Sequence, residues 1–158
     1  MKGERNTQVY QVGPCLFGTS STIPHWKTKE LIPSLKPFLL SLDTYKKKEL
    51  KIAFSLAVQP ESESREEDHA KYRSLVEFEW EGATCRISVI PDTDSYLITI
   101  LAPNDPKEYT AYFFYGFTKG VLFLHETEAD AFVLNNILMM IYAFNTACSD
   151  TVLMHASV

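Results

Sequence analysis

Residues 75–89 read LVEFEWEGATCRISV, and this stretch decides the fold class that we expect. Apolar residues alternate with glutamates before Gly82 and with polar residues after it, which is the period of a half-buried β-strand. Gly82-Ala83 suits a two-residue type II′ turn, because glycine accepts the positive φ of the first turn position. The stretch therefore predicts an antiparallel hairpin.

A turn at these two residues also implies a register for the hairpin. It gives the cross-strand pairs Trp80–Cys85, Phe78–Ile87 and Glu79–Arg86. Apolar side chains then meet on one face and opposite charges meet on the other, and both kinds of pair stabilise a sheet. We expect the apolar face of the hairpin to lie toward the core.

Short strands on both sides extend this hairpin into a sheet. We expect them at residues 9–12, 15–17, 50–58, 96–101, 109–115 and 121–124, with turns at 103–106 and 116–120. The connections after residue 75 are short, so they favour an antiparallel meander over β-α-β units. The predicted fold class is α+β, with an antiparallel β-meander sheet of about five to seven strands in a single domain, residues 1–158.

Two segments before the hairpin are less regular. Pro33 and Pro37 interrupt residues 24–40, which predicts one or two short helical turns instead of a long helix. Residues 59–68 hold five acids and no apolar residue other than Pro60. We therefore expect an exposed, mobile loop there, because it offers little apolar area to bury.

One long helix, residues 128–148, is expected to pack on the sheet. Thr127 suits its N-cap, and the acids of its first turn would face the positive end of the helix dipole. A continuous apolar face consists of Ala129, Phe132, Val133, Ile137, Met140, Phe144 and Ala147. Asn136 falls beside this face, and we expect it to be a hydrogen-bonded core amide.

Leu134, Leu138 and Tyr142 form a second apolar row on the other side of this helix. A helix that is apolar on two sides is usually covered on two sides. We therefore predict that another domain or a second copy of the chain covers this row, which would be more exposed than the first face in the chain alone. With His155, these three residues form the candidate interface for a domain or partner, and a homodimer is one outcome.

The chain's last 24 residues, 135–158, read NNILMMIYAFNTACSDTVLMHASV. A Tyr-Ala-Phe helix followed by Leu-Met-His-Ala-Ser-Val resembles the segment that enters the kinase domain of bacterial HPr kinase/phosphorylase. That family is related to the nucleotide domain of phosphoenolpyruvate carboxykinase. The resemblance implies that residues 149–158 are the entry strand of a P-loop kinase-like domain, and that the residues before them form its N-terminal accessory domain.

The phosphate-binding motif of that family does not occur in these 158 residues. Without GxxxxGK[ST] there is no recognisable backbone nest for phosphates, no P-loop lysine and no hydroxyl for Mg²⁺. We therefore assign no catalytic, cofactor-binding or metal residue here, and we expect ATP and Mg²⁺ only in a downstream domain. Helix capping explains the acids near His125 better than a metal site does.

Composition narrows the remaining classes of function. The net charge of −5 argues against non-specific binding of nucleic acid, and no apolar run is long enough to predict a membrane span. The start of the chain lacks the apolar stretch of a signal peptide, so we expect a cytoplasmic protein. Cys15, Cys85 and Cys148 are widely spaced, which predicts reduced thiols in a core instead of disulfides.

Two functions from different classes remain open. The first is the non-catalytic accessory role, which would be structural, regulatory or substrate-presenting. The second is a self-contained domain that binds a small ligand or a protein through an aromatic pocket, formed by residues such as Trp80, Tyr112 and Phe114. The abundance of aromatic residues supports this second reading, although a hydrophobic core accounts for it equally well.

Overall fold

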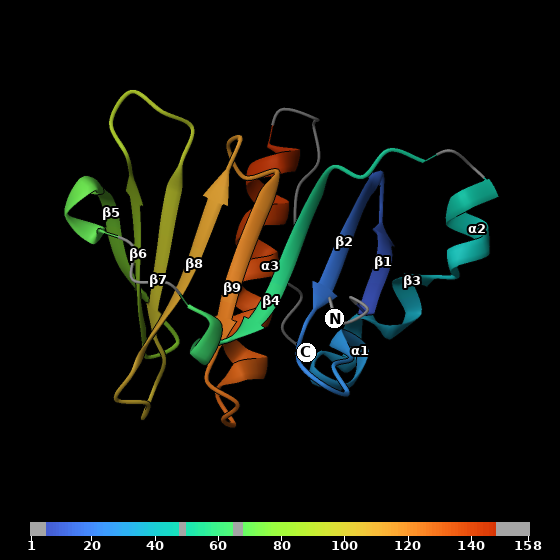
Figure 1. Ribbon diagram of the computed structural model, residues 1–158, viewed down its shortest axis with the longest axis horizontal. Helices are drawn as coiled ribbons and strands as arrows, with labels where there is room; N and C mark the ends of the chain where they lie inside the picture. The colour runs from blue at the N-terminus through green and yellow to red at the C-terminus, as the bar shows by residue number, and fades with distance from the viewer. Residues whose placement is uncertain (1–5, 48–49, 65–67, 148–158) are drawn as a thin grey trace.

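The computed structural model describes residues 6–47, 50–64 and 68–147, and these residues form one mixed sheet with a long helix packed on it (Figure 1). The described strands are β1 (Asn6–Val12), β2 (Cys15–Ser21), β3 (Leu39–Leu40), β4 (Phe54–Pro60), β5 (Arg73–Trp80), β6 (Ala83–Val89), β7 (Tyr96–Leu101), β8 (Glu108–Phe114) and β9 (Lys119–Leu124). The helices are α1 (Thr28–Leu31), α2 (Leu42–Lys47) and α3 (Asp130–Thr146), with 3₁₀ turns η1 (Pro33–Phe38), η2 (Glu61–Glu63) and η3 (His69–Lys71). The short turns expected around Leu31 and Leu35 are therefore present.

The α+β prediction is confirmed, but the purely antiparallel sheet is wrong. The spatial order is β3-β1-β2-β4-β9-β8-β7-β6-β5, and β5 to β9 do form the expected meander. Strand β4, which begins at Phe54 and not at residue 50, pairs in parallel with both β2 and β9. This one strand joins the N-terminal hairpin to the meander, so the sheet is larger than expected and mixed.

The predicted hairpin forms, but its register differs by two residues. Its turn is Glu81-Gly82, where both residues have positive φ, 51° and 81°. This is the backbone of a type I′ turn, in which glycine takes the second position. The observed pairs are Trp80–Ala83, Phe78–Cys85 and Glu77–Arg86. A slip of two residues leaves every side chain on its original face, so alternation alone does not distinguish the two registers.

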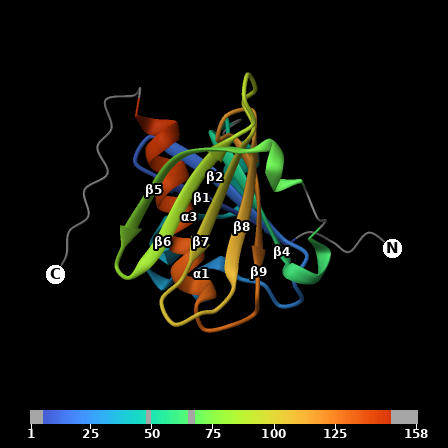
Figure 2. The same cartoon turned by 90° about the vertical axis from the view of Figure 1, so that its left-hand side faces the viewer.

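Helix α3 lies on one face of the sheet, which we call the inner face (Figures 1 and 2). The exposure predicted for its second apolar row is wrong: Leu134, Leu138 and Tyr142 are only 0%, 5% and 7% exposed. They belong to the same core cluster as the inner-face side chains Phe17 and Phe54. The reason is that β1 and β2 widen the sheet beneath the helix, so that this domain itself covers the row.

The first apolar face of α3 is less uniformly buried than its sequence indicates. Val133 and Ile137 are buried, whereas Phe144 is exposed at 41%. The predicted core amide is confirmed, because Asn136 is buried and its Nδ2 donates to the carbonyl of Phe132 at 2.8 Å. Cys15 and Cys85 are buried free thiols, as expected, while Cys148 lies outside the described residues.

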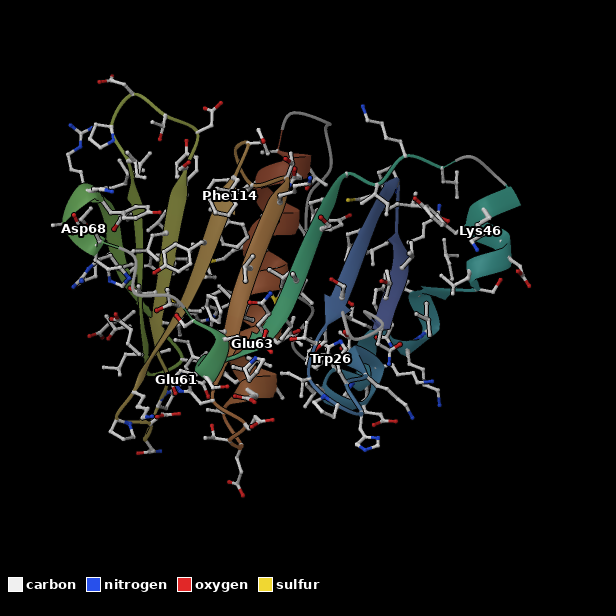
Figure 3. All side chains as sticks on the ribbon, viewed as in Figure 1. Trp26, Lys46, Glu61, Glu63, Asp68 and Phe114 are labelled. Atoms are coloured by element: carbon white, nitrogen blue, oxygen red, sulfur yellow. The ribbon has the colours of Figure 1, made fainter. Side chains whose placement is uncertain are left out.

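The chain crosses the sheet between β4 and β5 on the face opposite α3, which we call the outer face (Figure 2). Figure 3 marks Glu61 and Glu63 at one end of this crossover and Asp68 at the other. The expected loop is partly structured: its first two residues belong to β4, and η2 follows. Glu61 pairs with Lys107 at 3.2 Å, and Thr22 donates to Glu63 at 3.1 Å. Residues 65–67 lie outside the described part of the chain.

Replacing Leu138 tests whether the second row of α3 belongs to this domain's own core. We expect Leu138→Ala to lower the free energy of unfolding by about 2–5 kcal/mol, because the side chain is buried and its removal leaves a cavity. Urea unfolding followed by circular dichroism gives this value. The matched control is Leu75→Ala, whose side chain is 52% exposed, and it should change the stability far less. Equal effects of the two substitutions would contradict this assignment.

Candidate functional site

A polar cleft with a volume of about 400 Å³ lies on the outer face. This volume falls within the usual range for pockets that bind small molecules, about 300–1,000 Å³. Its floor consists of Ser88 on β6 and of Leu97 and Thr99 on β7, which are all buried. Ser88 pairs with Leu97 across β6 and β7, and Thr99 lies two residues after Leu97 on the same strand. All three side chains therefore lie on the outer face.

The crossover supplies one wall of this outer-face cleft. His69 in η3 lies over Tyr112 of β8, and its Nε2 is 2.8 Å from the tyrosine hydroxyl. The ring of Tyr72 packs beside the same tyrosine, with centroids 6.3 Å apart. Tyr112 is itself buried in a small apolar cluster with Leu97 and Phe123. This cluster holds the crossover against the sheet and so shapes the cleft.

Charged side chains form the rim of the cleft. Nε and Nη2 of Arg86 both donate to one oxygen of Glu77, at 2.8 and 2.6 Å. These hydrogen bonds and the charge of Glu77 raise the pKa of Arg86, and Glu108 adds a smaller effect in the same direction. The rim therefore carries one fixed cation between two carboxylates. Ser74 and His69 complete the polar lining.

One buried group in this cleft lacks a partner. The hydroxyl of Thr99 is buried and makes no hydrogen bond with the described residues. A buried hydroxyl without a partner is costly, so such groups are rare in folded proteins. Thr99 lies on the outer face between its cross-strand neighbours Arg86 and Thr110. A ligand on the floor of the cleft is one way to satisfy this hydroxyl.

The structure does not bring the sequence-predicted site residues into this cleft. Leu138 and Tyr142 line a small apolar cavity of about 80 Å³ on the other side of the sheet, and Leu134 lies in the core nearby. Tyr142 also donates to the carbonyl of Val12 at 3.1 Å. His155 and the predicted entry strand, residues 149–158, lie outside the described residues.

The aromatic pocket expected from Trp80, Tyr112 and Phe114 does not form. The register of β5 to β8 places Trp80 on the inner face and the other two side chains on the outer face. Sequence reasoning also missed His69 and Thr99 as cleft residues. No local pattern marks them, because η3 reaches β8 only through the long crossover.

A second polar cluster lies where α3 begins, and it corrects the predicted helix cap. The N-cap residue is Ala129, with no side-chain hydrogen bond, and Thr127 instead pairs with the hydroxyl of Tyr109 at 2.8 Å. Tyr109 donates to the buried carboxylate of Asp130 at 2.9 Å and stacks on His125 with a centroid distance of 3.8 Å. Asp130 also accepts from the backbone N–H of His125 at 3.3 Å. These contacts anchor the helix to β8.

Within residues 6–47, 50–64 and 68–147, no group of three or more His, Cys, Asp or Glu side chains is arranged to hold a metal ion. In the same part of the chain, no helix has the length and apolar character needed to cross a membrane. No protein-family model, curated protein or solved structure matches the chain.

The tyrosine in the second cluster predicts a dependence of stability on pH. Burial, together with the hydrogen bond to Asp130, raises the pKa of Tyr109 well above its ordinary value of about 10, while the bond to Thr127 opposes this. Above that pH the unfolded chain releases the proton and the folded chain keeps it. The stability that this group contributes is therefore complete below about pH 10 and is lost as the pH rises toward the folded-state pKa.

We expect Tyr109→Phe to make this alkaline loss of stability shallower. Tyr10 and Tyr142 also have raised pKa values through burial, so the dependence should not vanish. At neutral pH the variant should lose about 1–3 kcal/mol, because Asp130 loses a buried donor. Urea unfolding between pH 8 and 11 measures both effects. Tyr115→Phe is the control, since that side chain is 74% exposed, and an equal change in this control would contradict the assignment.

Proposed function

We propose that this chain is a non-catalytic accessory domain of a larger protein that resembles HPr kinase/phosphorylase. In that protein it would act beside a P-loop kinase-like domain, in a structural, regulatory or substrate-presenting role. The proposal rests on the resemblance of residues 135–158 and on one structural observation. Helix α3, which carries the Tyr-Ala-Phe motif, is covered on both sides by its own domain, and Thr146 in its last turn is still buried.

This observation supports the proposal through the order of elements along the chain. The core formed by the described residues extends to Thr146, so a folded unit precedes the residues that resemble an entry strand. Such a unit can be followed by a second domain with its own core, which is the usual organisation of larger chains. In this arrangement α3 would serve the N-terminal domain, and its buried second row would not be the docking surface.

The titratable groups of the described residues also fit a non-catalytic role, because several of them already have structural partners. Asp130 accepts from Tyr109, Glu77 accepts from Arg86, and His69 pairs with Tyr112. The second function, a domain that binds a small ligand, is favoured by the outer-face cleft. The two functions are compatible, since an accessory domain can regulate its neighbour by binding a ligand.

Nucleotide binding tests the non-catalytic role directly. We expect residues 1–158 neither to bind nor to hydrolyse ATP with Mg²⁺, because the sequence lacks a P-loop. Isothermal titration calorimetry and a phosphate-release assay measure the two activities. Binding or turnover above the level of a heat-unfolded control would contradict the proposal.

The gene provides a separate test of the relationship to a kinase. We expect the coding sequence to continue past residue 158 into a glycine-rich loop that ends in Gly-Lys-Ser or Gly-Lys-Thr. A coding sequence that stops there, or that continues without this motif, would contradict the accessory role. Ligand binding by the outer-face cleft would be unaffected by that result.

A further inference from the structure

We propose that the outer-face cleft binds a neutral polyhydroxylated ligand, of the class of a mono- or disaccharide. This inference is independent of the proposed link to a P-loop domain, since it uses only residues of β5 to β8 and the crossover. Three features of the cleft favour such a ligand: the balance of charge at the rim, the hydrogen-bonding groups on the floor, and the aromatic wall.

The charges at the rim disfavour an anionic ligand and offer little to a cationic one. An anion in the cleft would meet Glu77 and Glu108, while the guanidinium of Arg86 is already engaged by Glu77. A cation would find only the charge of Glu108 not offset by that pair. A neutral ligand avoids the repulsion by the carboxylates, and its hydroxyl groups can donate to the carboxylates and accept from the guanidinium.

The floor and the rim together offer both donors and acceptors over a short span of sheet. Ser74 and Ser88 face each other across β5 and β6, and Thr99 lies on the neighbouring strand β7. A hydroxyl can donate and accept at once, so such a floor matches a ligand that carries several hydroxyls. The Thr99 hydroxyl has no partner among the described residues, and it is the group that such a ligand would satisfy.

The aromatic wall suits the apolar side of a sugar ring. Tyr72 lines the cleft, half-buried, and its ring packs near Tyr112. A tyrosine ring presents an apolar face and a polar tip, which matches a molecule with C–H groups on one side and hydroxyls around its edge. Leu97 extends this apolar contact along the floor. The cleft thus combines one apolar wall with several polar groups, and polar groups at defined positions fix the orientation of a bound molecule.

Titration of the ¹⁵N-labelled protein with defined probes, followed by NMR, tests the proposal. The probes are methyl glycosides of glucose, galactose, mannose and N-acetylglucosamine, and the disaccharide cellobiose, with choline as the cationic and inorganic phosphate as the anionic comparison. At about 0.1 M, a glycoside with a dissociation constant of about 10 mM would occupy about 90% of the sites. We expect at least one glycoside to shift the amide resonances of Ser74, Ser88 and Thr99 in ¹H–¹⁵N spectra.

Two substitutions locate the binding. Tyr72→Ala should weaken binding of the responding glycoside by about tenfold or more, whereas Tyr115→Ala, at an exposed tyrosine outside the cleft, should leave it unchanged. Thr99→Val keeps the shape of the side chain and removes the hydroxyl, so it should weaken binding about two- to tenfold. A purely structural Thr99 would change the melting temperature and leave the affinity unaltered.

Three outcomes would overturn the proposal. The first is that no glycoside shifts the cleft resonances at about 0.1 M. The second is that choline or phosphate shifts them and the glycosides do not, which would assign the cleft to a cation or an anion. The third is that a glycoside binds with the same affinity to the wild type and to both cleft variants, because the ligand would then lie elsewhere. Thr99→Val keeps this test decisive if Tyr72→Ala fails to fold.

Discussion

The parallel pairing of β4 with β2 and β9 is the constraint on which the rest of the structure depends. Its inward side chains, Phe54, Leu56 and Val58, are buried at the centre of the core. The strand joins two hairpin systems that would otherwise be separate sheets. It also runs in the same direction as β5, from which four strands separate it, so the chain must recross the sheet to begin the meander. The outer-face cleft exists because of that crossover.

The same constraint explains why α3 needs no external partner for its second apolar row. A meander of β5 to β9 alone would leave one side of the helix uncovered, as its sequence pattern indicates. With β1 and β2 added beside β4, the sheet extends beneath that side, and Leu138 and Tyr142 pack near Phe17. The hydrogen bond from the Tyr142 hydroxyl to the carbonyl of Val12 then links the helix to the N-terminal hairpin. The width of the sheet therefore explains why α3 is apolar, and buried, on two sides.

The sequence predicts contacts between segments that are close together in the chain, and it does not predict contacts between distant segments. Alternation before and after Gly82 was enough to predict the hairpin, and the short connections were enough for the meander. The exact register was not predictable, because Glu77 and Glu79 both lie on the face of Arg86 and either could pair with it. The parallel contacts of β4 join segments that are far apart in the chain, and no local sequence pattern predicts such a pairing. His69 and Thr99 were missed as cleft residues for the same reason.

The polar character of the outer face follows from this architecture as well. On the inner face of the meander, the paired row from Val76 to Leu122 is apolar. Its members Ile87, Ile98, Ala111 and Leu122 are buried in the core with α3, whereas Val76 on the edge strand β5 is 46% exposed. Among the described residues, the crossover covers the outer face at Tyr112, where Leu97, Tyr112 and Phe123 form a small buried apolar cluster. Beside that cluster the face carries serines, a threonine and paired charges, and the buried Thr99 hydroxyl there needs water or a ligand as its partner. An antiparallel meander can leave one face open in this way, and here the crossover turns part of that open face into a site.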